Sequence, residues 1–384
     1  MKTNLTIPGW LALAALLSLN LQPATVNAQS GAWITNLATV MPRAQGAAAT
    51  VGGKVYMVGG GNYSCGVYPT LQAYDPASNI WNNLAPMPTA RYEVGVAELN
   101  CLLYAIGGNP GCGSSGLSAV EAYNPGSNSW STLAPLPTGL AQPGVVSANG
   151  KIYAIGGWSH NGIVVYSVYC YDPAANSWSL KTPIPVEFVS CGGAAVAVNG
   201  IIYAIGTINA SGQCQGVYAY DPVADAWTAK TSMPTARSGC AAAEVHGIIY
   251  VAGGYTSSGT SATVEAYNPA TDSWSTVTPL PFPLYTASAA AANGTLYVMG
   301  GYDVSFSTVG SVEAFSPNFL AINMYPGLTI YGQIGSTYEI DCCNNLSISN
   351  WTALTTMVLS NSPCLYIDTN STYFSHRFYR AVQQ

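Results

Sequence analysis

Charged residues are scarce in this sequence, and no basic cluster occurs. Only 7% of the 384 residues are charged, with 16 acidic against 10 basic side chains. Proteins that bind nucleic acid need clustered Lys and Arg to neutralise phosphates, so the composition predicts no nucleic-acid partner. The hydrophobic fraction of 49% excludes a disordered chain, because it is ample for a large core.

Patterns that hold metals or cofactors are also missing. The sequence has three histidines, and none of its ten cysteines form the Cys-x-x-Cys pair typical of zinc sites. Glycine combinations such as Gly111 to Gly113 follow a predicted strand without opening a helix, which excludes a dinucleotide fingerprint. Neither a Gly-x-Ser-x-Gly elbow nor a zinc-protease histidine pair occurs. We expect no metal and no cofactor.

The apolar run near the N-terminus is too short to span a membrane. Residues 10–21 fall well short of the ~20 apolar residues that a spanning helix needs. The run follows Lys2 and precedes small residues that end in Val26-Asn27-Ala28, an order typical of a secretory signal peptide. We therefore expect a signal peptide at residues 1–28, a secreted, periplasmic or cell-surface location, and no membrane span after cleavage.

A four-part pattern recurs six times along the chain with a period of about fifty residues. An apolar strand ends in a glycine doublet, a strand with an aromatic residue follows, Trp stands seven residues later, and Pro another seven on. In the third copy, Asn149-Gly150 predicts a tight hairpin before the strand. The doublets begin at Gly59, Gly107, Gly156, Gly253 and Gly300, with Gly206-Thr207 as a degenerate member. Each copy therefore predicts four short strands, which is one blade of a propeller.

The sixth copy lacks the tryptophan that should follow its aromatic residue. Ile322 stands seven residues after Phe315. Trp33 instead precedes Tyr56 by 23 residues, which is the spacing between Trp and the next doublet-strand Tyr in other copies. We expect the N-terminal segment to supply the outermost strand of the last blade and so close the ring.

These motifs resemble kelch repeats, and the chain from about Gly31 to Pro317 is similar to a six-bladed kelch β-propeller. The resemblance implies an all-β fold with a propeller domain over residues 29–317, although Thr207 and Cys101 replace expected glycines. Residues 318–384 lose the period but still alternate apolar and polar positions, which predicts a small β-sandwich-like module. This module resembles the short C-terminal β-modules of exported bacterial proteins, and we expect it to stabilise or attach the protein without chemistry.

Export would permit disulfide bonds. Cys65 and Cys112 fall in corresponding loops of successive repeats, while Cys364 could pair with Cys342 or Cys343. The sequence does not fix the connectivity. Buried free thiols are the alternative for Cys101 and Cys170.

By resemblance to kelch proteins, a ligand would bind the face that combines the loops between second and third strands with the connections between blades. Trp158 stands out of phase with the repeat, so it either stacks on a sugar ring or pins its own loop. Three arginines are in phase, each thirteen residues before its doublet-strand tyrosine. They form either a cationic rim for a carboxylate or an acidic sugar, or a repeat-wide set of hydrogen bonds to loop carbonyls. The candidate ligand-binding residues are Trp158, His160, Arg43, Arg91, Arg237, Tyr63, Tyr255 and Tyr302.

The sequence favours a non-catalytic, monomeric interaction protein that binds a carbohydrate or a cell-surface protein. Kelch copper radical oxidases need two histidines on one face, where this chain offers His160, and sialidase boxes are missing. A resemblance to exported kelch epimerases of sialic acid implies an alternative, with Glu187 as base, His160 as acid and Arg237 as anchor for the substrate carboxylate. A structural cell-surface spacer is the third hypothesis.

Overall fold

The structure, a computed structural model, describes residues 31–317 except 36, 113, 160, 161, 187, 189–191 and 210, together with five strands nearer the C-terminus. It divides the chain into two units, Met1–Asn318 and Phe319–Gln384. Predicted Glu187 and His160 lie outside the described residues, and so does the expected signal peptide.

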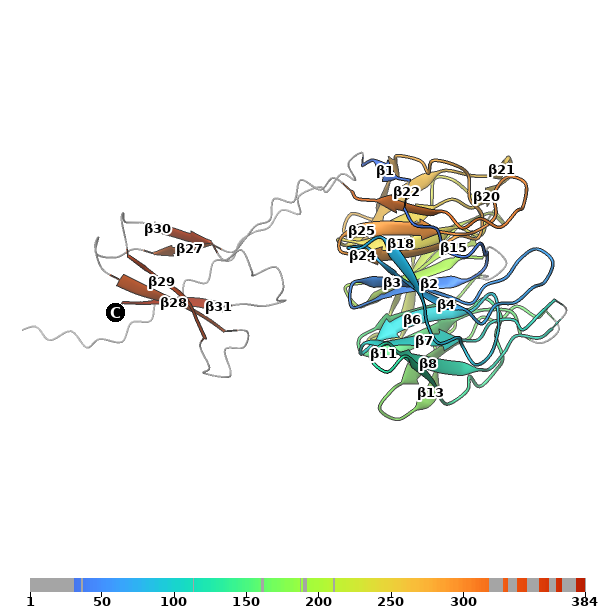
Figure 1. Cartoon of the computed structure of the whole chain (residues 1–384), viewed down its shortest axis with the longest axis horizontal. Coiled ribbons are helices and arrows are strands. Elements are labelled where there is room, and N and C mark those ends of the chain that lie inside the picture. The colour runs from blue at the N-terminus through green and yellow to red at the C-terminus, as the bar shows by residue number, and fades with distance from the viewer. Residues whose placement is uncertain are drawn as a thin grey trace, which may run out of the picture. The chain divides into compact units, whose positions relative to one another are not determined.

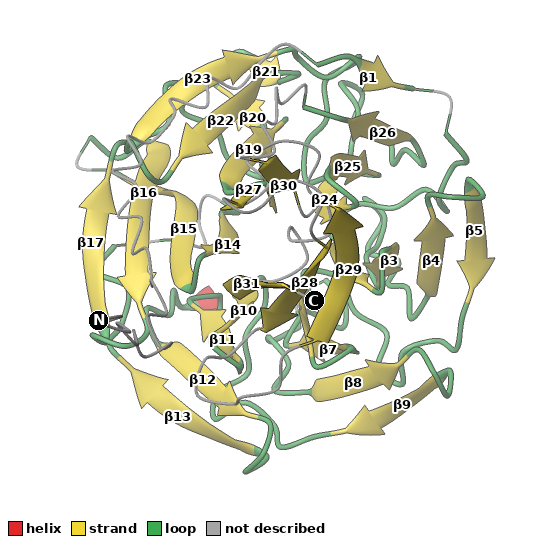
Figure 2. Cartoon of the chain, turned by 90° about the vertical axis from the view of Figure 1, so that its left-hand side faces the viewer, coloured by secondary structure: helices red, strands yellow, loops and turns green. Residues whose placement is uncertain are grey.

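Six antiparallel four-stranded sheets surround one axis in the first unit, as Figure 2 shows. The first strands of neighbouring sheets contact one another, so they surround the axis and the fourth strands lie outermost. The strands of blades 1 to 3 are β2 (Ala47–Val51), β3 (Lys54–Val58), β4 (Leu71–Asp75), β5 (Ile80–Asn83), β6 (Gly95–Leu99), β7 (Leu102–Ile106), β8 (Val120–Asn124), β9 (Ser129–Thr132), β10 (Gly144–Ala148), β11 (Lys151–Ile155), β12 (Val168–Asp172) and β13 (Ser177–Lys181).

Blades 4 to 6 repeat this arrangement, and the described part of the first unit is therefore a six-bladed β-propeller. Their strands are β14 (Ala194–Val198), β15 (Ile201–Ile208), β16 (Cys214–Asp221), β17 (Ala226–Lys230), β18 (Ala241–Val245), β19 (Ile248–Ala252), β22 (Val264–Asn268), β23 (Ser273–Val277), β24 (Ser288–Ala292), β25 (Thr295–Met299), β26 (Val312–Phe315) and β1 (Trp33–Ile34). A small hairpin, β20 (Tyr255–Thr256) with β21 (Gly259–Thr260), extends a loop of blade 5.

The N-terminal strand closes the ring, as predicted. Strand β1 pairs with β26 in the order β1-β26-β25-β24, with Trp33 opposite Phe315. The two rings lie 5.2 Å apart, and Trp33 Nε1 donates a hydrogen bond to the Thr278 carbonyl of blade 5 at 3.0 Å. The first and last parts of the propeller are therefore fastened within one sheet.

The recurring Tyr and Trp clamp each blade to the one before it. In blade 3, the rings of Tyr171 and Trp178 lie 5.1 Å apart, and Trp178 Nε1 donates to the Ala134 carbonyl of the preceding connection at 2.9 Å. Tyr171 Oη donates to Asn176 Oδ1 at 2.7 Å, and the same oxygen accepts the Ala134 N–H at 3.0 Å. Blades 1, 2, 4 and 5 make the same set of bonds through Asn79, Asn128, Asp225 and Asp272.

Two departures from the repeat change the backbone locally. In blade 4, Thr207 replaces the second glycine, and the strands continue past it with register shifts on both sides. In blade 2, Cys101 takes the hairpin glycine's place at φ 62°, a left-handed conformation that costs a side-chain residue energy. Both blades keep all four strands.

Residues 319–384 contain five described strands in two antiparallel sheets. One sheet pairs β27 (Gly327–Ile330) with β30 (Cys364–Ile367). The other has the order β29-β28-β31, formed by β28 (Thr337–Cys343), β29 (Thr352–Val358) and β31 (Phe378–Gln383) (Figure 1). Among the described residues of the whole chain, no helix is long and apolar enough to cross a membrane.

Candidate functional site

One end of the propeller carries the loops between second and third strands, and we call it the loop face. Connections between blades reach this face, where one residue of each pairs with the following loop. The described pairs are Ala44 with Gly61, Tyr92 with Asn109, Ala141 with Trp158, Ser238 with Tyr255, and Tyr285 with Tyr302. The backbone of Trp158 is therefore in phase with the repeat, although its side chain does not belong to the recurring tryptophans. Its side chain occupies the position where other blades place Gly, Asn or Tyr.

The next residue of each connection lines the mouth of the central channel. These residues adopt left-handed φ values of 50° to 59° and lie around a pocket of about 140 Å³. Backbone bonds join them from blade to blade, since Glu93 N donates to Gln45 O at 2.7 Å and Gln142 N donates to Glu93 O at 2.9 Å. We define the channel mouth by Gln45, Glu93, Gln142, Gly192, Gly239 and Thr286.

Glu93 supplies a carboxyl group at this mouth. Burial raises its pKa to about 7, against a smaller opposing effect of a hydrogen bond with Asn109. Gln45 Nε2 lies 3.4 Å from Glu93 Oε1. The ion pairs found among the described residues all involve other carboxylates. Glu93 is therefore a half-buried acid that amide groups contact and that can change charge near neutral pH.

An aromatic cluster lies beside the mouth and comprises Tyr63, Tyr255, Tyr285, Tyr302 and Phe306. It draws on loops of blades 1, 5 and 6 and on the connection between blades 5 and 6. Ring centroids are 6.1 Å apart for Tyr63 and Tyr302, 6.0 Å for Tyr255 and Phe306, and 5.6 Å for Tyr255 and Tyr285. Tyr63 is 74% exposed, and Tyr255 and Phe306 are each 41% exposed.

Tyr302 joins the aromatic cluster to the channel mouth. Its side chain is buried, and burial is the main cause that raises its pKa to about 12, with Tyr285, Tyr92, Tyr63 and Glu93 adding to the shift. Tyr285 is likewise close enough to Glu93 for that carboxylate to raise its pKa, after the larger effect of burial. The Tyr285 ring lies against Gly239 at the mouth and 6.3 Å from the Tyr302 ring, so the aromatic cluster borders the mouth.

The structure thus brings three predicted ligand residues together, namely Tyr63, Tyr255 and Tyr302. Trp158 is half-buried in the loop of blade 3, and the ring contacts found among the described residues do not join it to the cluster. The positions of His160 and Glu187 relative to the site stay predictions.

The three in-phase arginines lie inside the blades, not on an exposed rim. Arg43 and Arg91 have no exposed surface, and Arg237 is 1% exposed. Arg91 Nη2 donates to Glu121 Oε2 at 2.9 Å and to the Ala105 carbonyl at 3.1 Å. This burial contradicts the expectation that the arginines line the channel rim. The contacts support the alternative, a repeat-wide structural role.

Arg237 uses the equivalent partners in blade 5, and Arg43 uses the equivalent third-strand position in blade 1. Arg237 Nη2 donates to the Val251 carbonyl at 3.0 Å and lies 3.1 Å from Glu265 Oε2. Arg43 donates to the Gly59 carbonyl at 3.0 Å and to Thr70 Oγ1 at 2.6 Å, and it also bonds the side chain of Gln72. These bonds fasten the doublet strand to the third strand beneath the loop face.

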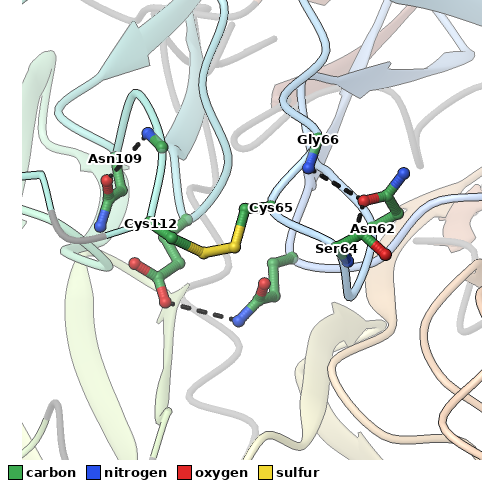
Figure 3. Close-up of a disulfide and its surroundings, with 9 residues drawn as sticks. Asn62, Ser64, Cys65, Gly66, Asn109 and Cys112 are labelled. Carbon is green, nitrogen blue, oxygen red and sulfur yellow. Dashed lines mark hydrogen bonds between the residues drawn. A yellow bond between two sulfur atoms is a disulfide. The ribbon is translucent and has the colours of Figure 1, made fainter.

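A disulfide ties together two loops of the loop face. Cys65 of blade 1 bonds Cys112 of blade 2, with the loop residues Asn62 and Asn109 nearby (Figure 3). Asn62 Oδ1 accepts the N–H groups of Ser64 at 3.1 Å and Gly66 at 2.9 Å, which shapes the first loop. Cys214 is also disulfide-bonded, whereas Cys101, Cys170 and Cys240 are free.

Comparison with known proteins gives the family. The family model for the KLHDC2/KLHL20/DRC7 Kelch-repeats domain matches residues 47–231 and 143–320. The chain belongs to the kelch-repeat family. The tyrosines, tryptophans and glycine doublets described above are thus kelch motifs, and the six sheets are kelch blades, a fold that mediates protein interactions.

Curated kelch relatives match short stretches. Kelch-like ECH-associated protein 1B of Danio rerio is 36% identical over 92 residues, which are 22% of this chain and 15% of that protein. Kelch-like protein 25 of Homo sapiens is 40% identical over 68 residues, which are 18% of this chain and 12% of that protein. The match thus spans less than one sixth of each relative.

A solved structure supports the fold. The structure of YjhT aligns with a TM-score of 0.61 over 71% of this chain and 95% of that chain, at 18% sequence identity. At this level of identity the likeness extends to the propeller architecture and no further.

Several residues of the site were missed by the sequence interpretation. Gln45, Glu93, Gln142 and Thr286 each stand eleven residues before a doublet-strand tyrosine, so the repeat itself marks their position. Their identities differ from blade to blade, and a search for recurring residues therefore passes over them.

Proposed function

We propose that this chain is an exported, monomeric interaction protein whose loop face binds a partner protein at a cell surface. The observation that carries the proposal is the aromatic cluster, in which exposed rings from three blades are in contact. Protein interfaces are enriched in aromatic side chains and depleted of charge in their centre. The buried arginines leave this face poor in charge, which supports the same use.

Variants in the aromatic cluster test whether a partner protein binds this surface specifically. The double variant Tyr63→Ala/Phe306→Ala removes two exposed rings of the cluster. Ile80→Ala/Leu180→Ala removes two side chains that are 52% and 67% exposed on outer strands, and serves as the matched control. A display library of cell-surface proteins should yield a partner that binds wild type and control but loses at least about tenfold in affinity, ~1.4 kcal/mol, for the cluster variant. A partner that binds both variants equally would show that the cluster is not the binding surface.

Carbohydrate binding is the other form of the proposal. Tyrosine rings beside the amides of Gln45 and Gln142 offer flat apolar surface edged by hydrogen-bonding groups, which suits a sugar ring. A glycan array probed with the same three proteins separates the two forms. Glycan binding that disappears with the cluster variant, together with an empty protein screen, would replace the protein partner with a carbohydrate.

A sugar-processing enzyme of the sialic acid epimerase type is a second candidate, and Glu93 is the observation that favours it. A carboxyl group with a pKa near 7 in a pocket is suited to proton transfer at neutral pH. Mutarotation of sialic acid can be followed by proton NMR with wild type and Glu93→Gln. Acceleration over buffer that Glu93→Gln abolishes supports the enzyme, and a rate equal to buffer removes it. If no interaction of the protein depends on the loop face, the third hypothesis, a structural cell-surface spacer, stays the prediction.

A further inference from the structure

We infer that the channel mouth and the aromatic cluster bind a cationic side chain, a lysine ammonium or an arginine guanidinium, that protrudes from the partner protein. This inference rests on the function proposed above and specifies the chemistry of the partner. It draws on three features of the mouth, namely its charge, its aromatic wall and its shape.

Among the described residues, no ion pair balances the charge of Glu93 at the mouth. Arg91 stands two residues before Glu93, but its guanidinium points into blade 2, where it contacts Glu121. Arg43 and Arg237 are buried in their own blades in the same way. The polar groups that face Glu93 are the amides of Gln45 and Asn109 and the phenols of Tyr92, Tyr285 and Tyr302. An incoming cation would therefore meet a carboxylate whose charge nothing in the described residues balances.

Tyrosines form the wall on which a cation can rest. The ring of Tyr285 lies against the backbone of Gly239 at the mouth, and its centroid is 6.3 Å from that of Tyr302. Ammonium and guanidinium groups are attracted to the faces of aromatic rings, most strongly where water is partly excluded. A carboxylate beside several tyrosines thus recognises the positive charge and the alkyl stem of a basic side chain together.

Two glycines let an aromatic ring and an amide approach the mouth closely. Gly192 and Gly239 occupy the mouth positions where the other blades carry Gln, Glu or Thr. A Cβ on Gly239 would clash with the ring of Tyr285, so that ring lies over the glycine backbone at the mouth. The amide of Gln142 lies over Gly192 in a similar way, 3.0 Å from where a Cβ would stand. An amide and an aromatic ring therefore lie over the mouth that Glu93 also lines.

Small amines test this inference without any partner. The mature protein, labelled with 13C at glutamate carboxyls, is titrated at pH 8 with n-butylammonium, n-butylguanidinium and neutral n-butanol, and followed by NMR. We expect saturable shifts of the Glu93 carboxyl with a cation, binding at least about tenfold weaker for n-butanol, and a fall of about one unit in the Glu93 pKa at saturation. The relative affinities of the two cations distinguish a lysine from an arginine.

Matched variants locate the effect. Glu93→Gln should weaken cation binding by at least about tenfold, whereas Glu98→Gln, which removes the same charge near the far end of the following strand β6, should leave it unchanged. Gln142→Glu places a second carboxyl at the mouth and should tighten binding. For wild type, binding should weaken as the pH falls from 8 to 5.5 and Glu93 takes up its proton.

Equal binding of n-butanol and n-butylammonium would overturn the inference, and so would undiminished cation binding by a folded Glu93→Gln protein. If that variant does not fold, the wild-type pH profile and Gln142→Glu decide. Failure of the inference is distinguishable from failure of the proposed function. If a partner binds through Tyr63 and Phe306 but no amine binds, only the inference of a cationic side chain fails. If amines bind but no partner is found, only the proposed function fails.

Discussion

At the scale of single residues, blade 6 contains a buried acid without the arginine partner that the equivalent acids of blades 2 and 5 have. Glu121 and Glu265 on third strands pair with Arg91 and Arg237, and Gln72 bonds Arg43. Glu313 holds the same strand position in blade 6 and is 1% exposed. The connection before blade 6 has Leu284 at the position where the connections before blades 1, 2 and 5 have an arginine. Glu313 Oε2 has no hydrogen-bond partner among the described residues. Burial raises the Glu313 pKa to about 7.

This shift makes stability depend on pH. The folded pKa lies above the value of about 4.5 that the unfolded chain keeps. Stability from the protonated acid is therefore fully present below about pH 4.5 and falls as the pH rises towards 7. Glu313→Gln should raise the free energy of unfolding at pH 8 by roughly 2 kcal/mol and leave it nearly unchanged at pH 4. Urea unfolding at both pH values measures the difference.

Glu121→Gln is the matched control, because it is the same substitution at the same strand position. It removes the charge that balances buried Arg91, so it should destabilise the protein by at least about 2 kcal/mol at pH 8. A Glu313→Gln protein less stable than wild type at pH 8 would show that the carboxylate is solvated or paired. Some pH dependence should remain in that variant, because burial also raises the Glu93 pKa to about 7.

At the scale of elements, the two-residue strand β1 joins the ends of the propeller. Its indole packs on Phe315 and donates to the Thr278 carbonyl. Thr278 Oγ1 also donates to the Gly31 carbonyl at 2.9 Å, which binds the same segment to blade 5. In blades 1 to 5, the clamping Trp lies on the fourth strand, which follows the third strand directly in the chain. In blade 6, strand β1 from the N-terminal segment supplies this Trp.

Trp33→Ala should therefore destabilise the whole propeller. Loss of the half-buried ring should lower the free energy of unfolding by about 2 to 4 kcal/mol, while Trp33→Phe keeps the ring and should cost about 1 kcal/mol for the lost hydrogen bond. Urea unfolding of the three proteins measures this order. A change below about 0.5 kcal/mol for Trp33→Ala would contradict closure through this strand.

The elements also show why the sequence predicted the ring well and the site poorly. Blade packing depends on Tyr, Trp and glycine at fixed spacings, because each blade meets the same neighbour. The mouth residues share a left-handed backbone instead of a side chain, so Gln45, Glu93 and Thr286 do not look like one set. The arginines were ambiguous because their partners lie on third strands, about thirty residues away. Trp158 does not belong to the recurring tryptophans, whereas its backbone bridge is common to five blades.

At the scale of the whole molecule, the propeller is a closed scaffold that presents one variable face. Interblade clamps hold the outer strands, buried arginines fasten the strands beneath the loops, and the Cys65–Cys112 bond ties two loops together. Rigid support of this kind lowers the ordering cost when loops bind a partner. The proposed function assigns binding to loop residues that differ between blades, with Glu93 and the aromatic cluster at their centre.

Hydrogen–deuterium exchange of the protein with its captured partner tests the loop face most directly. We predict that binding slows exchange in the aromatic loops of blades 1, 5 and 6, around Tyr63, Tyr255 and Phe306, and leaves the hairpin at Asn149 and Gly150 on the opposite end unchanged. Slowed exchange at that hairpin or along the outer strands, with the aromatic loops unaffected, would contradict the account.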